Sequence, residues 1–457
     1  MFLINPLTTP VIWQKIQWIL DPVSYLMKSS KEHPDLFTGE VSGFGGKLVF
    51  VSHPSAIQQI LTNDRQLFFA NGELNNLLTP IVGYSSLLSL DGENHKRERK
   101  LLMPSFHGER MEIYGDLIIS ITENVFNQLQ EGKTFIVREL MQEISLQVIL
   151  KIVFGLSEGN QFERIKELIK AILNRFNSPI NISFLFYNWL RKDFGAWSPW
   201  GSFMKTQKEL DDLIYSEISL RRQENNLNNT DILSTLLIAV DENGKGMTNQ
   251  ELRDELMLML FAGHETTAIA MTWALYWLYH YPDLKAKLLT ELQENPQKDG
   301  TSIFKLPYLT AVCNETLRIY PVAMLTFPRQ VTADTELLGL KIPKDTVVMG
   351  CIYLTHHRED LYPEADKFKP ERFLNRQYSP YEFLAFGGGV RRCLGEVLAL
   401  YEMKLVIAKI ITTYDFTLPT NQEIKPKRRG VVLSPEGGVK MIFKGKIQSN
   451  LDLAPLS

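Results

Sequence analysis

The chain has 457 residues, and 49 Lys and Arg against 52 Asp and Glu leave a formal net charge of −3. Hydrophobic residues make up 44% and charged residues 22%, the usage of an ordinary soluble globular protein. This composition excludes a disordered chain, a collagen-like repeat and a generally basic nucleic-acid binder, so we expect no nucleic acid among the partners. The length predicts two or three domains unless one large fold accounts for it.

The most apolar piece near the N-terminus covers residues 11–20 and is interrupted by Gln14, Lys15 and Gln17. Ten residues cannot span a bilayer, which needs about 20. Because Trp13, Ile16 and the pair 19–20 recur at helical spacing, we expect a short amphipathic helix packed on the body. A helix resting on a membrane surface is the alternative. We expect a soluble, cytoplasmic protein that is at most peripheral to a membrane.

The chain then predicts one early strand followed by a long helical region. The strand covers 48–51. The expected helices cover 55–63, 96–103, 108–130, 138–154, 161–177, 203–223, 231–239, 248–281, 282–293 and 306–320.

The pattern changes after residue 320. Segments 331–337 and 345–352 predict a β-hairpin, and 356–389 is rich in Pro, Gly and charge and predicts a long ordered loop. A last helix is expected over 394–414, followed by strands near 431–433 and 439–443. Since no repeat and no flexible linker is found, the sequence predicts a single mainly α domain over 1–457, with a minor β-rich part near 35–70 and 325–355.

The expected helix 248–281 is the longest. Thr248 and Glu251 form a capping box at its start, and about 33 residues make it roughly 50 Å long. It is apolar nearly all round, which is typical of a buried helix, yet Glu265 stands at its midpoint. Burying a carboxylate costs several kcal/mol unless it is paired. Two interpretations fit this helix. The polar residues are either a cluster in the core whose hydrogen bonds are satisfied, or a functional site. A zinc-protease motif does not fit, because residue 268 is Ala.

The chain has three cysteines, and only Cys393 lies in an unusual setting. Cys313 and Cys351 are interpreted as buried thiols, because three Cys at wide spacing make no disulfide framework. Segment 386–395, FGGGVRRCLG, has three glycines that allow tight backbone folding, and Cys393 lies where a helix begins. The helix dipole and two neighbouring Arg are expected to lower the pKa of this thiol. The resulting thiolate would be an iron ligand or a nucleophile.

Segment 386–395 matches F-x-x-G-x-R-x-C-x-G at every specified position, and so resembles the haem-binding signature of the cytochrome P450 family of haem-thiolate monooxygenases. Segment 262–267, AGHETT, is similar to the oxygen-activation motif of that family, and 315–318 is similar to its E-x-x-R. Segment 368–373, FKPERF, follows in the family's order. The resemblance runs from about residue 49 to 443. One departure is H-x-x-x-R at 95–99, where many relatives carry W-x-x-x-R.

This resemblance implies the P450 fold, haem b and a set of haem contacts. Cys393 would be the axial ligand of the haem iron and would favour O–O cleavage. Two buried propionates need charge-assisted donors. The resemblance assigns propionate contacts to His95, Arg99, Arg329 and Arg391, and further haem contacts to Phe386, Gly387, Gly395 and Ala262.

The resemblance also assigns roles around the central helix and the E-x-x-R segment. Thr266 would position water and donate a hydrogen bond during oxygen activation, and Glu265 would connect that site to bulk protons. Glu315, Arg318 and Arg372 would form a structural charge network that holds the cysteine segment and retains haem.

The segments expected around the substrate are dominated by Leu, Ile, Phe and Met. This favours an apolar guest such as a fatty acid or a terpene or sesquiterpene. The overall pattern resembles bacterial, cyanobacterial-type fatty-acid-hydroxylating members of the family, and this resemblance makes a long-chain fatty acid the first expectation. Residues 184–189 would line an entrance, touch a membrane or pack as an ordinary helix. The expected pocket residues are Leu87, Leu88, Phe261, Ala262, Ala323, Met324, Leu325 and Val432.

No flavin or nicotinamide module is recognisable in the sequence. We therefore expect electrons from NAD(P)H to reach a monomeric, O₂-using enzyme through a ferredoxin or flavodoxin with its reductase. An acidic partner would dock on Lys96, Arg97, Lys100 and Arg392.

Two other classes of function stay open. A haem-thiolate peroxygenase or isomerase would need no electron partner, and the pair Glu265 and Thr266 argues against it. A non-catalytic haem sensor would bind haem without turnover.

Overall fold

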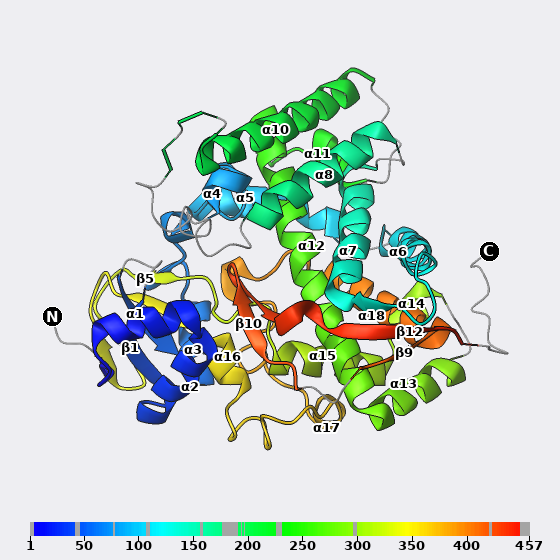
Figure 1. Ribbon diagram of the computed structural model, residues 1–457. Helices are drawn as coiled ribbons and strands as arrows, with labels where there is room; N and C mark the ends of the chain where they lie inside the picture. Colours follow the sequence, from blue (N-terminus) through cyan, green and yellow to red (C-terminus); the bar gives the residue numbers. More distant parts are fainter. Residues whose placement is uncertain are drawn as a thin grey trace.

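The computed structural model describes residues 4–41, 46–75, 78–106, 110–155, 159–175, 191–192, 194–195, 197–224, 231–295, 299–419 and 423–447. A large helical part surrounds one long central helix, and a smaller β-rich part formed by N-terminal segments and the yellow segment near β5 lies at one side (Figure 1). None of the helices within these ranges is long and apolar enough to cross a membrane.

The helices of the N-terminal half are α1 (Val11–Leu20), α2 (Pro22–Glu32), α3 (Pro54–Thr62), α4 (Thr79–Val82), α5 (Gly92–Leu102), α6 (Arg110–Phe126), α7 (Val137–Phe154), α8 (Asn160–Arg175) and α10 (Pro199–Glu224). Those of the C-terminal half are α11 (Ile232–Ile238), α12 (Asn249–His280), α13 (Pro282–Glu294), α14 (Gly300–Phe304), α15 (Pro307–Ile319), α16 (Ile352–His356), α17 (Arg372–Asn375) and α18 (Glu396–Thr413).

The strands form four small sheets. They are β1 (Leu36–Val41), β2 (Gly46–Val51), β3 (Phe68–Phe69), β4 (Thr134–Ile136), β5 (Arg329–Val331), β6 (Thr335–Leu337), β7 (Leu340–Ile342), β8 (Val347–Gly350), β9 (Tyr414–Thr417), β10 (Pro426–Arg429), β11 (Val432–Pro435) and β12 (Lys440–Lys446). The orders are β1-β2-β8-β5-β3, β4-β12-β9, β6-β7 and β10-β11.

The central helix α12 begins at the predicted capping box: the Thr248 side chain accepts from Glu251 N at 3.1 Å, and the Glu251 carboxylate accepts from Thr248 N at 2.7 Å. It packs along α7 and also against α18 and α15, and Figure 1 shows it running through the middle of the molecule. Its second half is buried nearly all round, as its apolar sequence predicts. This arrangement places residues 262–267 at the centre of the protein.

The β-rich part is more elaborate than the sequence predicts. The expected hairpin over 331–337 and 345–352 is two nested antiparallel pairs, with β6 and β7 inside β5 and β8. β8 also pairs in parallel with β2, so the early strand and the late segment share one sheet. Such long-range pairing, and the strand β1 beside β2, carry no local sequence signal.

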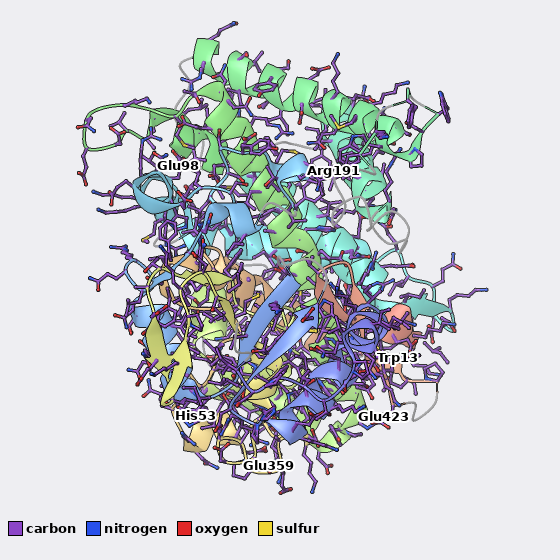
Figure 2. The ribbon with its side chains drawn as sticks, turned by 90° about the vertical axis from the view of Figure 1, so that its left-hand side faces the viewer. Trp13, His53, Glu98, Arg191, Glu359 and Glu423 are labelled. Atoms are coloured by element: carbon purple, nitrogen blue, oxygen red, sulfur yellow. The ribbon has the colours of Figure 1, made fainter. Side chains whose placement is uncertain are left out.

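The expectation for α1 is wrong in orientation. We expected Trp13, Ile16, Ile19 and Leu20 to pack on the body, but all four are exposed. The buried side chains are those of Gln14 and Trp18. Figure 2 looks onto the side of the molecule that carries Trp13.

Candidate functional site

A cavity of about 390 Å³ lies between the middle of α12 and the cysteine segment, residues 386–395. Elements far apart in the sequence line it, including α5, α7, α12, α18 and the segment before β5. Of the predicted haem contacts, the cavity is lined by His95, Arg99, Ala262, Phe386, Gly387, Arg391, Cys393 and Gly395.

Small residues and two hydroxyl groups shape the wall that α12 contributes. Thr266 Oγ1 donates to Ala262 O at 2.7 Å, and Thr267 Oγ1 donates to Gly263 O at 2.9 Å, so each hydroxyl bonds its own helix one turn back. A Cβ on Gly263 would lie 2.9 Å from Cδ1 of Ile149 on α7. Gly263 therefore serves the close packing of α7 on α12, while Ala262 opens towards the cavity.

Glu265 faces away from the cavity and is held by α7 and the β10–β11 hairpin. Gln142 Nε2 donates to Glu265 Oε2, and Arg429 Nη1 lies 3.5 Å from Glu265 Oε1. The neighbouring His264 is buried, and burial lowers its pKa to about 4, so it is neutral at pH 7. The midpoint carboxylate of the helix is thus paired, as its burial requires.

The cysteine segment is folded tightly against α3 and the residues that follow it. Gly387 and Gly389 have φ values of 67° and 64°, the left-handed region that favours glycine. A Cβ on Gly389 would lie 2.2 Å from Oδ2 of Asp64, which also accepts from Val390 N at 2.6 Å. Cys393 N donates to Phe386 O at 3.0 Å and closes the segment. The glycines are needed for this conformation, as the sequence predicts.

The expected lowering of the Cys393 pKa is wrong in the isolated chain. The following helix α18 begins at Glu396, so Cys393 precedes its first turn. Burial raises the pKa of the Cys393 thiol, and the Gly395 N–H together with Arg99 and Arg392 opposes this rise only in part. Desolvation therefore outweighs the helix terminus here.

Basic side chains from three distant segments converge beside the cavity. His95 and Arg99 come from α5, Arg329 from β5 and Arg391 from the cysteine segment. Burial and the nearby guanidinium groups of Arg391, Arg99 and Arg329 lower the pKa of His95 to about 3. Burial lowers the pKa of both Arg329 and Arg391 to about 10. A buried cluster of like charges requires an anionic partner.

These residues fit the carboxylates of haem. Among the described residues, Arg329 Nε, Arg329 Nη2 and Arg391 Nε have no hydrogen-bond partner. The carboxylate of Asp64 stays 3.8 Å from Arg329 Nη2. Arg391 also donates to Leu87 O at 2.8 Å and to Ala70 O at 2.9 Å, which fixes its direction. Arg329 is not among the residues that line the cavity.

Glu315, Arg318 and Arg372 form a buried network. Arg318 Nε and Nη2 donate to the two Glu315 oxygens at 2.7 and 2.9 Å, and both side chains are fully buried. Arg372 Nε donates to Glu315 Oε1 at 3.1 Å. Arg318 Nη1 further donates to His356 O at 2.7 Å, so the network joins α15 to the long loop before the cysteine segment.

Six of the eight predicted pocket residues line the cavity, and two do not. Those six are Leu87, Leu88, Ala262, Ala323, Leu325 and Val432. Phe261 precedes Ala262 by one position, so the helix turns its side chain to another face. Met324 is buried in the N-terminal cluster with Trp18 and Phe50. Residues 184–189 lie outside the described residues.

Sequence reasoning missed several lining residues that come from elements far apart in the sequence. They are buried or half-buried side chains on α5, α7, α12 and α18 and next to them, and they include Leu102, Phe106, Ile149, Glu255, Leu398 and Glu402. Each lies in an ordinary helical pattern or beside one, so no local signal separates it from core.

The expected basic docking surface is largely neutralised by ion pairs. Lys96 pairs with Glu93 at 3.2 Å and Lys100 with Glu242 at 2.6 Å. Arg392 pairs with Glu396 at 2.7 Å, and Arg97 pairs with Asp241, also at 2.7 Å.

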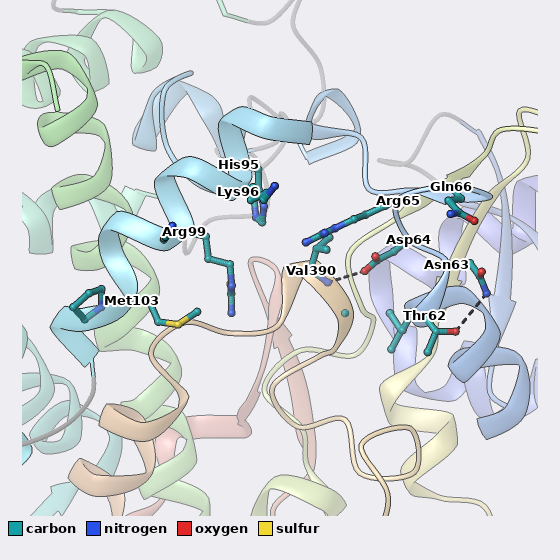
Figure 3. Close-up of a pocket in the computed structure, with 14 residues that line it drawn as sticks. Thr62, Asn63, Asp64, Arg65, Gln66, His95, Lys96, Arg99, Met103 and Val390 are labelled. Carbon is teal, nitrogen blue, oxygen red and sulfur yellow. Dashed lines mark hydrogen bonds between the residues drawn. The ribbon is translucent and has the colours of Figure 1, made fainter. Parts of the chain in front are cut away.

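A surface groove of about 1020 Å³ lies beside this region. Figure 3 shows its two sides, α5 with His95 and Lys96 and the segment 62–66 with Asp64 and Arg65, on either side of Val390.

Comparisons with known proteins show the family and the fold. The profile of the family described as cytochrome P450 matches residues 5–443. Cytochrome P450 135B1 of Mycobacterium tuberculosis is 32% identical over 94% of this chain and 88% of its own length. Cytochrome P450 135A1 of the same organism is 32% identical over 91% of this chain and 90% of its own length. The solved structure titled retinoic acid bound cyanobacterial CYP120A1 superposes with a TM-score of 0.81 at 24% identity, covering 94% of this chain and 96% of that one.

The chain belongs to the cytochrome P450 family and has its fold. It is an oxidoreductase, a haem-thiolate monooxygenase that uses O₂ and electrons from a redox partner.

Proposed function

We propose that this monooxygenase hydroxylates a long-chain fatty acid. The observation that carries this proposal is the apolar part of the cavity lining. Leu87, Leu88, Ala323, Leu325 and Val432 lie there. Such a wall gains free energy by covering a hydrocarbon chain rather than a polar guest.

The proposed site has haem b held from two directions. Cys393 would hold its iron, and His95, Arg99, Arg329 and Arg391 would hold its propionates, because Arg329 and Arg391 carry unpartnered donors that need anionic acceptors. When bound there, haem would supply the iron that activates oxygen, and the thiolate ligand would donate electron density to that iron.

The remaining roles fall to residues of α12 and α15. Thr266 orients water with its hydroxyl at the cavity wall, and Glu265 carries protons from the Gln142 and Arg429 side of α12. Glu315, Arg318 and Arg372 retain haem by holding the loop that leads to the cysteine segment.

A second candidate substrate is a terpene or sesquiterpene. Among the described lining residues, Lys and Arg occur only on α5 and in the cysteine segment. A substrate carboxylate that lay elsewhere in the cavity would have no cationic side chain to pair with. This favours a neutral substrate. The retinoic acid bound to the similar cyanobacterial structure is an isoprenoid acid, so its skeleton matches the terpene candidate and its carboxyl group matches the fatty-acid candidate.

Electrons from NAD(P)H reach the haem through a ferredoxin or flavodoxin with its reductase. The groove beside the cysteine segment supports this proposal, because Arg65 and Arg99 line it and keep it basic where Lys96 and Lys100 are paired with carboxylates. An acidic protein would be steered to such a groove, with a rate that falls as salt rises.

The test is a titration of the purified haem protein with fatty acids, their methyl esters and sesquiterpenes, followed through the haem absorption. Turnover with NADPH, a ferredoxin and its reductase then identifies products. We expect the fatty acids to shift the spectrum and yield hydroxylated products. Products from sesquiterpenes alone would overturn the first candidate and support the second. Turnover by peroxide that fails with the ferredoxin pair would contradict the proposed electron route.

A further inference from the structure

The outer face of α1 is apolar. Ile12, Trp13, Ile16, Ile19 and Leu20 lie within about a third of the helix circumference at 3.6 residues per turn. Their exposed fractions are 69% for Ile12, 56% for Trp13, 39% for Ile16, 54% for Ile19 and 75% for Leu20. Isolated exposed apolar residues are normal, but a continuous stripe marks an interaction surface.

The inner face shows that this orientation is built into the fold. Trp18 is 2% exposed, and its ring centroid lies 5.8 Å from those of Tyr25 and Phe50. Gln14 Oε1 accepts from Glu40 N at 2.9 Å. Arg428 Nη1 donates to Trp18 O at 3.0 Å. A rotation that buried the apolar stripe would break these contacts, so the stripe is held outward.

We propose that α1 is an anchor that lies on the surface of a lipid bilayer, with this stripe in the acyl boundary. The helix contains no Asp or Glu, and Lys15 and Gln17 border the stripe, where headgroups would meet them. Trp13 is suited to the interface, because its ring is apolar and its N–H is polar. An amphipathic helix that presents its apolar face outward is the usual form of such an anchor.

The extent of the stripe favours lipid over a second copy of this chain. A stable protein interface needs about 20–30 residues on each side. Including Val11, α1 offers six exposed apolar side chains on a helix about 15 Å long. A bilayer needs no matching surface, so a short stripe suffices there.

The helix that carries the stripe is also tied to a wall of the cavity. Arg428, which holds α1, lies on β10, and the turn after it exposes Val431 by 42%. The next residue, Val432, lines the cavity. Docking through α1 would therefore bring the β10–β11 hairpin, and with it one cavity wall, close to the lipid in which apolar substrates dissolve.

The experiment is flotation of the full-length haem protein with vesicles of phosphatidylcholine and phosphatidylglycerol in equal parts. The wild-type protein should float with the vesicles. A triple variant, Ile12→Ser with Ile16→Ser and Leu20→Ser, should bind about tenfold more weakly, because it loses apolar area from the bilayer. The matched control replaces Ile113, Leu220 and Ile238 with Ser, which are 51%, 50% and 53% exposed on α6, α10 and α11. It should float like the wild type.

A second measurement locates the contact without removing apolar surface. Brominated lipids should quench the fluorescence of Trp13, so quenching should be weaker in Trp13→Phe, which still floats. Equal flotation of the triple variant and the wild type, or no flotation of the wild type, would overturn the proposal. So would light scattering that shows a wild-type dimer, a monomeric triple variant and no vesicle binding.

Discussion

The three cysteines of this chain have the same chemistry and different surroundings. Cys313 and Cys351 are buried, and burial raises the pKa of each thiol to about 12, so both remain protonated and inert. Cys393 opens to the cavity, and the Gly395 N–H and two Arg partly offset its burial. The position of the sulfur, rather than its intrinsic acidity, distinguishes the proposed ligand.

Replacing Cys393 with Ala should abolish the carbon monoxide absorption band of the reduced enzyme from which the P450 family takes its name. The band depends on thiolate ligation of the iron, which Ala cannot provide. Cys351→Ala is the matched control and should retain it. A normal band in Cys393→Ala would refute the assignment of this ligand.

Thr266 and Thr267 are adjacent, and both hydroxyls bond a carbonyl oxygen one turn back. Both residues line the cavity, but Thr267 is only 4% exposed, whereas Thr266 is half-buried. Thr266→Ala should therefore divert more of the consumed NADPH to hydrogen peroxide, because water loses its orienting hydroxyl. The measurement compares peroxide formed with NADPH consumed, and Thr267→Ala should stay near the wild type. An unchanged peroxide yield in Thr266→Ala would count against the role of this hydroxyl.

At the scale of elements, the network on α15 joins parts of the chain that are far apart in the sequence. Glu315 accepts from Arg318, from Arg372 and from Lys369 N, the last at 2.8 Å. α15 is thereby fixed to the loop that leads towards the cysteine segment. Breaking a buried pair leaves an uncompensated charge, which costs far more than losing a surface pair.

Glu315→Ala should lower the free energy of unfolding by about 3–5 kcal/mol, because it leaves Arg318 buried without its partner. Urea unfolding of the haem protein, together with the haem content after purification, measures this effect. Glu167→Ala, which removes an exposed pair with Arg164 on α8, is the control and should leave both quantities unchanged. Equal stability of the two variants would show that the network is not structural.

At the scale of the whole molecule, the free energy of unfolding should depend on pH through one buried carboxyl group at the cavity. Glu402 of α18 lines the cavity and is 3% exposed. Burial raises its pKa to about 8, and Ser145 of α7 offsets only part of this rise. The folded protein therefore keeps a proton at Glu402 that the unfolded chain loses at a lower pH.

The contribution of Glu402 to the free energy of unfolding should decrease as pH rises from about 4.5 to about 8 and level off above that range. In this window the folded state binds more protons than the unfolded state, so the slope against pH is negative. Glu402→Gln should reduce this decrease, and Glu167→Gln should leave it intact. Urea unfolding at a series of pH values tests both, and equal slopes would contradict the effect of burial at Glu402.

Local chemistry determined much of this protein in advance. The capping box at Thr248 set the start of α12, and the glycines of the cysteine segment set its fold, because caps and left-handed turns depend on neighbouring residues. The sequence also identified the family, since its motifs are short and consecutive. The E-x-x-R pair was predictable for the same reason.

Only the tertiary structure decided what depends on packing between distant segments. It left Arg329 outside the cavity lining, turned Phe261 from the cavity, paired Lys100 with Glu242 and faced the apolar stripe of α1 outward. It also raised the pKa of Cys393, against the expectation from the helix terminus. Burial and pairing arise from contacts between residues far apart in the chain, and no local pattern records them.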